Sequence, residues 1–320
     1  MTGSLIAADL MAALPSPLDS TAKTAYVAAR VIDYLGTALF LGGGVFVAWL
    51  WPAGGQVRAA RRLLILGWSA GLVGTVAAIG LEGAWTNQSS PGTAWHWSLI
   101  EQTLKLDFGR EWSAKALLWV LAGVVLADLL RRGERAAVSL PWRVGFAAIG
   151  LGILRVTGLT GHAADAHYPA LSEVADLVHL AGMSLWIGGL AVLLFAVLPR
   201  RQPAELAALL PRFSKLAMGS VLTVIVAGTV LAWQLVGGFG ALVDTTYGEL
   251  LLTKIALLVV ILVAAQGSKA WITHRLDFAV VLRGDAATVR PFVLSVAVET
   301  ALVLLVLIAA SFLVTAYPGA

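Results

Sequence analysis

Three histidines between positions 162 and 179 are the residues of this 320-residue chain best suited to metal chemistry. His162 and His167 lie just before a long apolar run, and His179 lies within that run. Asp176 precedes His179 by three positions and Met183 follows it by four, so the three share one face of a helix. Imidazole binds copper in either oxidation state, and a thioether favours Cu(I). The spacing therefore predicts a histidine-led metal site built from these five side chains.

Two other interpretations of these residues stay open. A histidine in a membrane helix also serves as a hydrogen-bonded packing residue, and a lone methionine also serves as core. A b-type haem needs two histidines on facing helices, which His162 and His179 are able to supply. The sequence has no cysteine, which excludes thiolate sites, disulfides and a cysteine nucleophile. It also lacks a Gly-rich phosphate loop and an HExxH motif, so we expect no enzyme.

The composition is that of a membrane protein. Hydrophobic residues make up 59% of the chain and charged residues 12%, and the mean hydropathy is +0.87. Soluble domains carry roughly 25% charged residues, and lipid accommodates an apolar excess that a soluble core does not. The net charge of +4 is also compatible with nucleic acid. However, the arginines lie in short loops between apolar runs, where they set topology, so we expect the lipid bilayer and no nucleic acid as partner.

Hydropathy predicts an all-α, polytopic chain with about eight helices long enough to cross a bilayer. The predicted spans are 23–51, 62–85, 111–130, 142–161, 172–198, 213–236, 248–271 and 291–315. Arginine and lysine concentrate in the loops after the first, third, fifth and seventh spans, as in the Arg-rich segment 131–143. Cation-rich loops face the cytoplasm, so both termini are predicted to lie outside, on the periplasmic side.

Two parts of the chain repeat a spacing of small and polar residues. The first predicted span carries Asp33, Gly36, Phe40, Gly42 and Gly43, and the fifth carries His179, Gly182, Trp186, Gly188 and Gly189 at the same spacing. Gly109 and Lys115 in the third span match Gly248 and Lys254 in the seventh. Parallel repeats of this kind build some transporters. We therefore expect one membrane domain, 1–320, made of two four-helix halves, 1–140 extended by the fourth helix to about 161, and 162–320. Asp33 and His179 would then be equivalent positions that face each other across the centre.

Ionisable side chains within the predicted spans gather in their outer halves. Such groups are costly in hydrocarbon and usually face the bundle interior or a water-filled path. The residues predicted to line or tune an outward-facing path are Asp33, Glu82, Arg155, Trp186, Lys254 and Glu299. The alternative is structural ion pairing, for example of Arg30 or Arg155 with Asp33 or Glu299. Lys115 and Lys254 have the further alternative of snorkelling to the membrane interface.

The second half carries motifs that resemble a known family. The motifs are Gly161-His162, His179-Leu180-Ala181-Gly182-Met183, Leu185-Trp186-Ile187-Gly188-Gly189-Leu190, Arg212-Phe213-Ser214-Lys215-Leu216, Ala227-Gly228, Tyr247-Gly248-Glu249-Leu250-Leu251-Leu252-Thr253-Lys254, Glu299 and Thr315-Ala316-Tyr317-Pro318. Together they resemble the CopD/PcoD copper-resistance membrane proteins. The resemblance is best over 155–315, and over 23–130 the eight-helix layout is the main match.

This resemblance implies copper handling in the bacterial inner membrane. The family is thought to move copper across that membrane, commonly toward the cytoplasm, and is often encoded beside or fused to a periplasmic CopC-like copper carrier. His162 and His179 fall on its histidine positions. The resulting hypothesis is a copper permease or copper-binding protein, with a copper ion of unassigned oxidation state and an unassigned oligomeric state. The alternatives are a b-type haem redox protein and a protein that delivers copper to an oxidase during assembly without transporting it.

Overall fold

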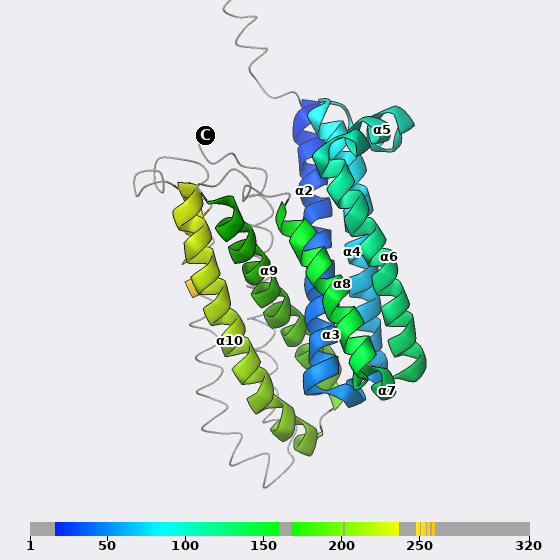
Figure 1. Ribbon diagram of the computed structural model, residues 1–320, viewed down its shortest axis with the longest axis vertical. Coiled ribbons are helices and arrows are strands. Elements are labelled where there is room, and N and C mark those ends of the chain that lie inside the picture. Colours follow the sequence, from blue (N-terminus) through cyan, green and yellow to red (C-terminus); the bar gives the residue numbers. More distant parts are fainter. Residues whose placement is uncertain are drawn as a thin grey trace, which may run out of the picture.

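The computed structural model describes residues 17–159, 168–200 and 202–236, together with several positions between 248 and 259. All regular elements in this part of the chain are helices, as Figure 1 shows. Within it, six helices are long and apolar enough to cross a membrane. The chain is therefore a polytopic, all-helical membrane protein, as the composition predicts.

The six spans are built from the following elements. The first consists of α2 (Pro17–Thr37), η1 (Ala38–Gly42), α3 (Gly43–Val45) and η2 (Phe46–Leu50). The next three are α4 (Arg58–Thr86), α6 (Asp107–Arg132) and α8 (Leu140–Leu159). The fifth combines α9 (Pro169–Val192), η6 (Leu193–Val197) and η7 (Leu198–Arg200), and the sixth is α10 (Pro203–Val236). The short helices η3 (Pro52–Gln56) and α7 (Glu134–Ala137) lie in the connections.

The first five predicted spans agree with these bounds to within a few residues, whereas the sixth begins earlier than predicted. Its helix starts at Pro203 rather than at 213 and continues through Pro211. Leu206 and Leu209 are buried in the main apolar cluster, which stabilises this added segment against the proline. The seventh span, 248–271, lies largely outside the described residues, although its described positions are helical, and 291–315 lies wholly outside them. The total of eight spans stays a prediction.

The connection between α4 and α6 contains two helices that the sequence did not predict. They are η4 (Pro91–Trp95) and α5 (Trp97–Lys105). α5 packs through Thr103, which lies against Gly83 of α4 and Gly109 of α6, while Trp97 is exposed. In Figure 1, α5 lies at one end of the bundle and α7 at the opposite end.

The spans pack in two groups, which meet where α9 contacts the first span and α8. α2 lies along α4, α4 along α6, and α6 along α8, while α9 lies along α10 and also contacts η1 (Figure 1). Glycines permit the closest approaches, as is common between membrane helices. A Cβ at Gly36 would collide with the backbone of Gly71, and one at Gly74 would lie 2.6 Å from the backbone nitrogen of Asp33. The backbone of α2 is thereby held directly against α4.

The first and fifth spans cross through a reciprocal backbone contact. A Cβ at Gly42 would collide with the carbonyl oxygen of Ser184, and one at Gly188 would collide with that of Ala38. One sequence offset relates position 38 to 184, position 42 to 188 and position 33 to 179. Each span also continues into a π-helical turn, η2 in the first and η6 in the fifth. Equivalent positions on the two spans thus make equivalent contacts.

A polar contact ties the first span to α10 near the α7 end of the bundle. The indole N–H of Trp51 donates a 2.6 Å hydrogen bond to Oε1 of Glu205, and Nε of Arg200 donates one of 2.9 Å to Oε2. The guanidinium of Arg200 also lies 5.7 Å from the centre of the Trp51 ring. Both carboxylate oxygens of Glu205 are therefore bonded, which holds the start of α10 against the first and fifth spans.

Candidate functional site

His179 lies in the middle of α9 with its ring turned toward α10. Only 8% of the residue is exposed. Its Nδ1 lies 3.1 Å from the carbonyl oxygen of Val224, and a Cβ at Gly228 would come within 3.3 Å of the imidazole Cε1. The absence of a side chain at Gly228 therefore leaves room for the ring against α10.

This contact fixes the chemistry that the imidazole is able to perform. A carbonyl oxygen only accepts hydrogen bonds, so Nδ1 carries the proton and donates to Val224. In the neutral ring the lone pair then lies on Nε2. Histidines that bind metals usually donate their other ring N–H to a carbonyl or carboxylate, which orients the ring. The Val224 carbonyl orients the His179 ring in the same manner.

The other predicted ligands in α9 make contacts with different neighbours. The Asp176 carboxylate lies over Gly158 of α8 and interacts electrostatically with Tyr34 of α2. Met183 is buried in the main apolar cluster, as is Trp186. His162 and His167 lie outside the described residues. Within the described part of the chain, no three His, Asp or Glu side chains lie close enough to hold a metal ion, so the five-residue site stays a prediction.

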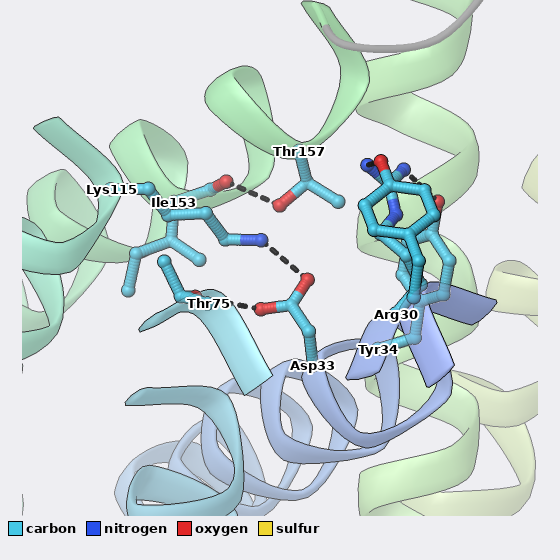
Figure 2. Close-up of polar contacts among 8 residues, drawn as sticks. Arg30, Asp33, Tyr34, Thr75, Lys115, Ile153 and Thr157 are labelled. Atoms are coloured by element: carbon cyan, nitrogen blue, oxygen red, sulfur yellow. Dashed lines mark hydrogen bonds and ion pairs between the residues drawn. The ribbon is translucent and has the colours of Figure 1, made fainter. Parts of the chain in front are cut away.

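A buried ion pair occupies the interface of α2, α4 and α6. Nζ of Lys115 donates a 2.6 Å hydrogen bond to Oδ2 of Asp33, and neither side chain has any exposed surface. The Thr75 hydroxyl donates a 3.0 Å hydrogen bond to the other carboxylate oxygen, Oδ1. Figure 2 shows the lysine and the threonine reaching this carboxyl group from two directions. Asp33 is thus held by groups from two neighbouring helices.

Arg30 adds a second fully buried cation one turn from Asp33. Its Nη2 donates a 2.7 Å hydrogen bond to the Tyr34 hydroxyl, and its Nη1 lies 3.4 Å from the Tyr26 hydroxyl oxygen. The guanidinium lies 4.8 Å from the ring centre of Trp112, and Nζ of Lys115 lies 4.6 Å from the same ring. The indole therefore attracts both cations through its electron-rich ring.

The remaining predicted path residues fall into three situations. Glu82 lies near Tyr26 and Arg30 and interacts electrostatically with both. The Oε2 of Glu82 is buried without a hydrogen-bond partner among the described residues. Arg155 has an exposed side chain. Lys254 and Glu299 are outside the described residues. Asp33 and Glu82 therefore belong to one polar cluster around Arg30.

Lys115 does not extend to the membrane interface, which was one of the alternatives for this residue. Its side chain points inward and pairs with Asp33, so the alternative of structural ion pairing describes it, with a partner that the sequence did not identify. The signal that could have found it is the repeat, because Lys115 keeps its spacing from Gly109 as Lys254 does from Gly248. A lysine whose side chain only extended to the membrane interface would not need to keep this spacing from the glycine.

The fold and these buried groups define a polytopic membrane protein with polar residues inside its helix bundle. The sequence profile of the family described as copper resistance protein D matches residues 207–313, and that of the copper resistance protein D-like N-terminal domain matches 19–168. The chain belongs to the CopD copper resistance protein D family.

Two curated relatives are similar to the chain at low identity. Copper transport protein CutJ of Bacillus subtilis is 27% identical over 263 residues, which cover 77% of this chain but only 46% of CutJ. Inner membrane protein YebZ of Escherichia coli is 27% identical over 313 residues, which cover 92% of this chain and 98% of YebZ. No solved structure matches the chain.

Proposed function

We propose that this chain transports copper ions across a bacterial inner membrane, from the periplasm to the cytoplasm. The family it belongs to, and its similarity to a protein named for copper transport, support this proposal. Similarity over nearly the whole length of YebZ, which is named as an inner membrane protein, supports the location. The chain spans only about half the length of CutJ. The name of CutJ therefore supports copper transport as a proposal for this chain and does not by itself assign it.

The orientation of His179 is the observation that carries the proposed site. Its Nδ1–H donates to the Val224 carbonyl, which orients the ring, and the proposal assigns the copper ion to Nε2. In the proposal, His162 and His179 capture copper, and His167, Asp176 and Met183 assist. A histidine-led set without cysteine accommodates either oxidation state of copper.

The proposed site opens toward the periplasm, with both termini on that side. The distribution of arginine supports this orientation, because the loops that contain η3 and α7 are the cation-rich ones. The α5 end of the bundle is then periplasmic. Copper would arrive there from a periplasmic CopC-like carrier. The residues that would line or tune its path are Asp33, Glu82, Arg155, Trp186, Lys254 and Glu299.

The proposed transporter consists of two repeated halves that meet at the crossing of the first and fifth spans. The reciprocal contacts of Gly42 and Gly188 support this arrangement, because a two-fold relationship makes residue i contact j wherever j contacts i. The surroundings of Asp33 and His179 support it as well. Gly74 of α4 lies against Asp33, and Gly228 of α10 lies against His179. A glycine of the following span thus accompanies each of the two positions.

Copper binding to the purified protein tests the site. Wild type is expected to bind copper, and the His162→Ala, His179→Ala double variant is expected to lose that binding. His96→Ala is the matched control, because His96 is exposed in the connection before α5. Equal copper stoichiometry in the wild type and the double variant would overturn the site assignment.

Two measurements separate the proposed function from its rivals. A Soret absorption band in the purified protein would indicate b-type haem and contradict a copper permease as the primary function. Copper uptake into proteoliposomes distinguishes transport from delivery to an oxidase, because a delivery protein binds copper without moving it across the bilayer.

A further inference from the structure

Helix packing alone does not explain why the interface of α2, α4 and α6 contains a charged pair, Asp33 and Lys115. Both side chains are completely buried, and Asp33 is the one hydrogen-bond acceptor described for an ammonium group that has three N–H donors. Buried ion pairs stabilise a fold no better than well-packed apolar side chains of similar volume, because desolvation offsets the attraction. A lysine retained in this place is therefore a candidate for chemistry.

The two buried cations of the cluster differ in whether they are able to release a proton. Arg30 keeps its proton under all ordinary conditions, and its guanidinium is held by the hydroxyls of Tyr26 and Tyr34. Lys115 is an amine, the cationic side chain that readily exchanges its proton when buried. Its proton is already shared with a carboxylate 2.6 Å away. The cluster thus pairs a permanent positive charge with an exchangeable one.

The described helices around this pair and the proposed metal site carry several charged and titratable groups. They are Tyr26, Arg30 and Tyr34 on α2, Glu82 on α4, Glu111 on α6 and Asp176 and His179 on α9, with Arg155 of α8 exposed. Tyr34 interacts electrostatically with Arg30, Asp33 and Asp176, and Asp176 lies one turn from His179. Because Tyr34 interacts with both Asp33 and Asp176, a cation bound beside Asp176 would change the electrostatic potential at the pair in a medium of low dielectric constant.

We propose that the Asp33–Lys115 pair is a proton-exchange site, which releases one proton as a metal cation binds near His179. Before binding, the pair consists of a carboxylate and an ammonium. Afterwards, Lys115 is a neutral amine that still donates an N–H to the carboxylate, and the proton is in water. No bond other than N–H is broken and no electron moves. The exchange offsets the positive charge that the metal brings into the bundle, where unbalanced charge is costly. This inference rests on the proposed function.

Proton release during copper binding tests the exchange. The purified protein in detergent is titrated with copper in weakly buffered solution that contains a pH indicator, and release is compared at equal bound copper. Wild type is expected to release about one proton more per copper than the Asp33→Asn, Lys115→Met double variant. Glu101→Gln with Lys105→Met removes an exposed ion pair of α5 and is expected to behave as wild type.

Lys115→Arg keeps the test decisive where the neutral double variant does not fold. Arginine retains the charge pair but does not release the proton, so this variant is expected to bind copper and to lack the extra proton. Equal proton release from wild type and Lys115→Arg, with copper bound in both, would show that the pair is only structural. Absence of copper binding in wild type would instead contradict the proposed function, and no bound copper would then cause the pair to release a proton.

Discussion

Lys115 and Asp33 form an ion pair with no solvent-exposed surface, although they are 82 residues apart in the sequence. The carboxylate is held by a lysine from α6 and a threonine from α4, so three helices meet at one charged group. Removing one member of such a pair leaves the other charge buried without compensation. The pair is therefore a point at which the packing of α2, α4 and α6 is sensitive to mutation.

Lys115→Met is expected to destabilise the protein by about 3–5 kcal/mol, because it leaves the Asp33 carboxylate unpaired. Adding Asp33→Asn to that variant is expected to recover most of the loss, since both charges are then removed. Unfolding in mixed detergent measures both variants. Lys105→Met removes an exposed pair and is expected to change stability by less than about 1 kcal/mol. Equal losses for Lys115→Met and Lys105→Met would contradict the burial of the pair.

The crossing of the first and fifth spans predicts a matched pair of glycine effects. Gly42→Ala and Gly188→Ala each place a methyl group against a carbonyl oxygen of the other span, so each is expected to cost about 1–3 kcal/mol. Gly145→Ala is the control, because nothing lies within 4 Å of a Cβ at that position. It is expected to be neutral or to stabilise α8 by up to about 1 kcal/mol. Thermal unfolding compares the three, and a Gly188→Ala variant as stable as Gly145→Ala would argue against the crossing.

The position of the His179 ring predicts an indirect effect on copper binding. A side chain at Gly228 pushes on the imidazole, so Gly228→Val is expected to weaken copper binding about 10-fold without removing a ligand. Gly219→Val changes the same helix at a position with open space and is expected to leave the affinity unchanged. Isothermal titration with copper measures both. If both variants bind as wild type does, the Val224 contact does not orient a ligand.

The orientation of the chain in the membrane is testable because the natural sequence has no cysteine. Ser98→Cys places a thiol on α5 and Glu134→Cys places one on α7, and both positions are exposed. A membrane-impermeant maleimide applied to intact spheroplasts is expected to label position 98 at once and position 134 only after permeabilisation. The reverse pattern would invert the proposed topology and place the α5 end in the cytoplasm.

Composition and hydropathy predicted the helical membrane class and the first five spans, because about 20 apolar residues in a row have few other stable arrangements. The start of α10 was not predictable in the same way. Locally, Pro211 indicates a helix boundary, whereas long-range contacts stabilise the helix before it, namely the burial of Leu206 and Leu209 and the hydrogen bond from Trp51 to Glu205. The helix α5 was missed because it has 9 residues and the side chain that it buries is the polar Thr103, so no long apolar run marks it in the sequence.

The same distinction applies to the candidate site. The local sequence identified some of its residues, whereas their partners depend on how distant helices pack. The sequence identified Asp33 and His179 as unusual polar residues in apolar helices, since their cost in lipid is a local property. It did not identify the partner of Asp33, because Arg30, Lys115 and Arg155 all lie in the predicted spans. Helix rotation and depth decide among them, and in the structure Lys115 reaches the carboxylate, while Arg30 bonds to Tyr34 and Arg155 is exposed.

Copper uptake into proteoliposomes is the most direct measurement of the central claim, which is histidine-led copper transport. Vesicles carrying the wild-type protein are expected to accumulate copper faster than protein-free vesicles, and the His162→Ala, His179→Ala variant is expected to fall to the protein-free rate. Wild-type uptake no faster than that of empty vesicles, or uptake by the double variant at the wild-type rate, would contradict the account.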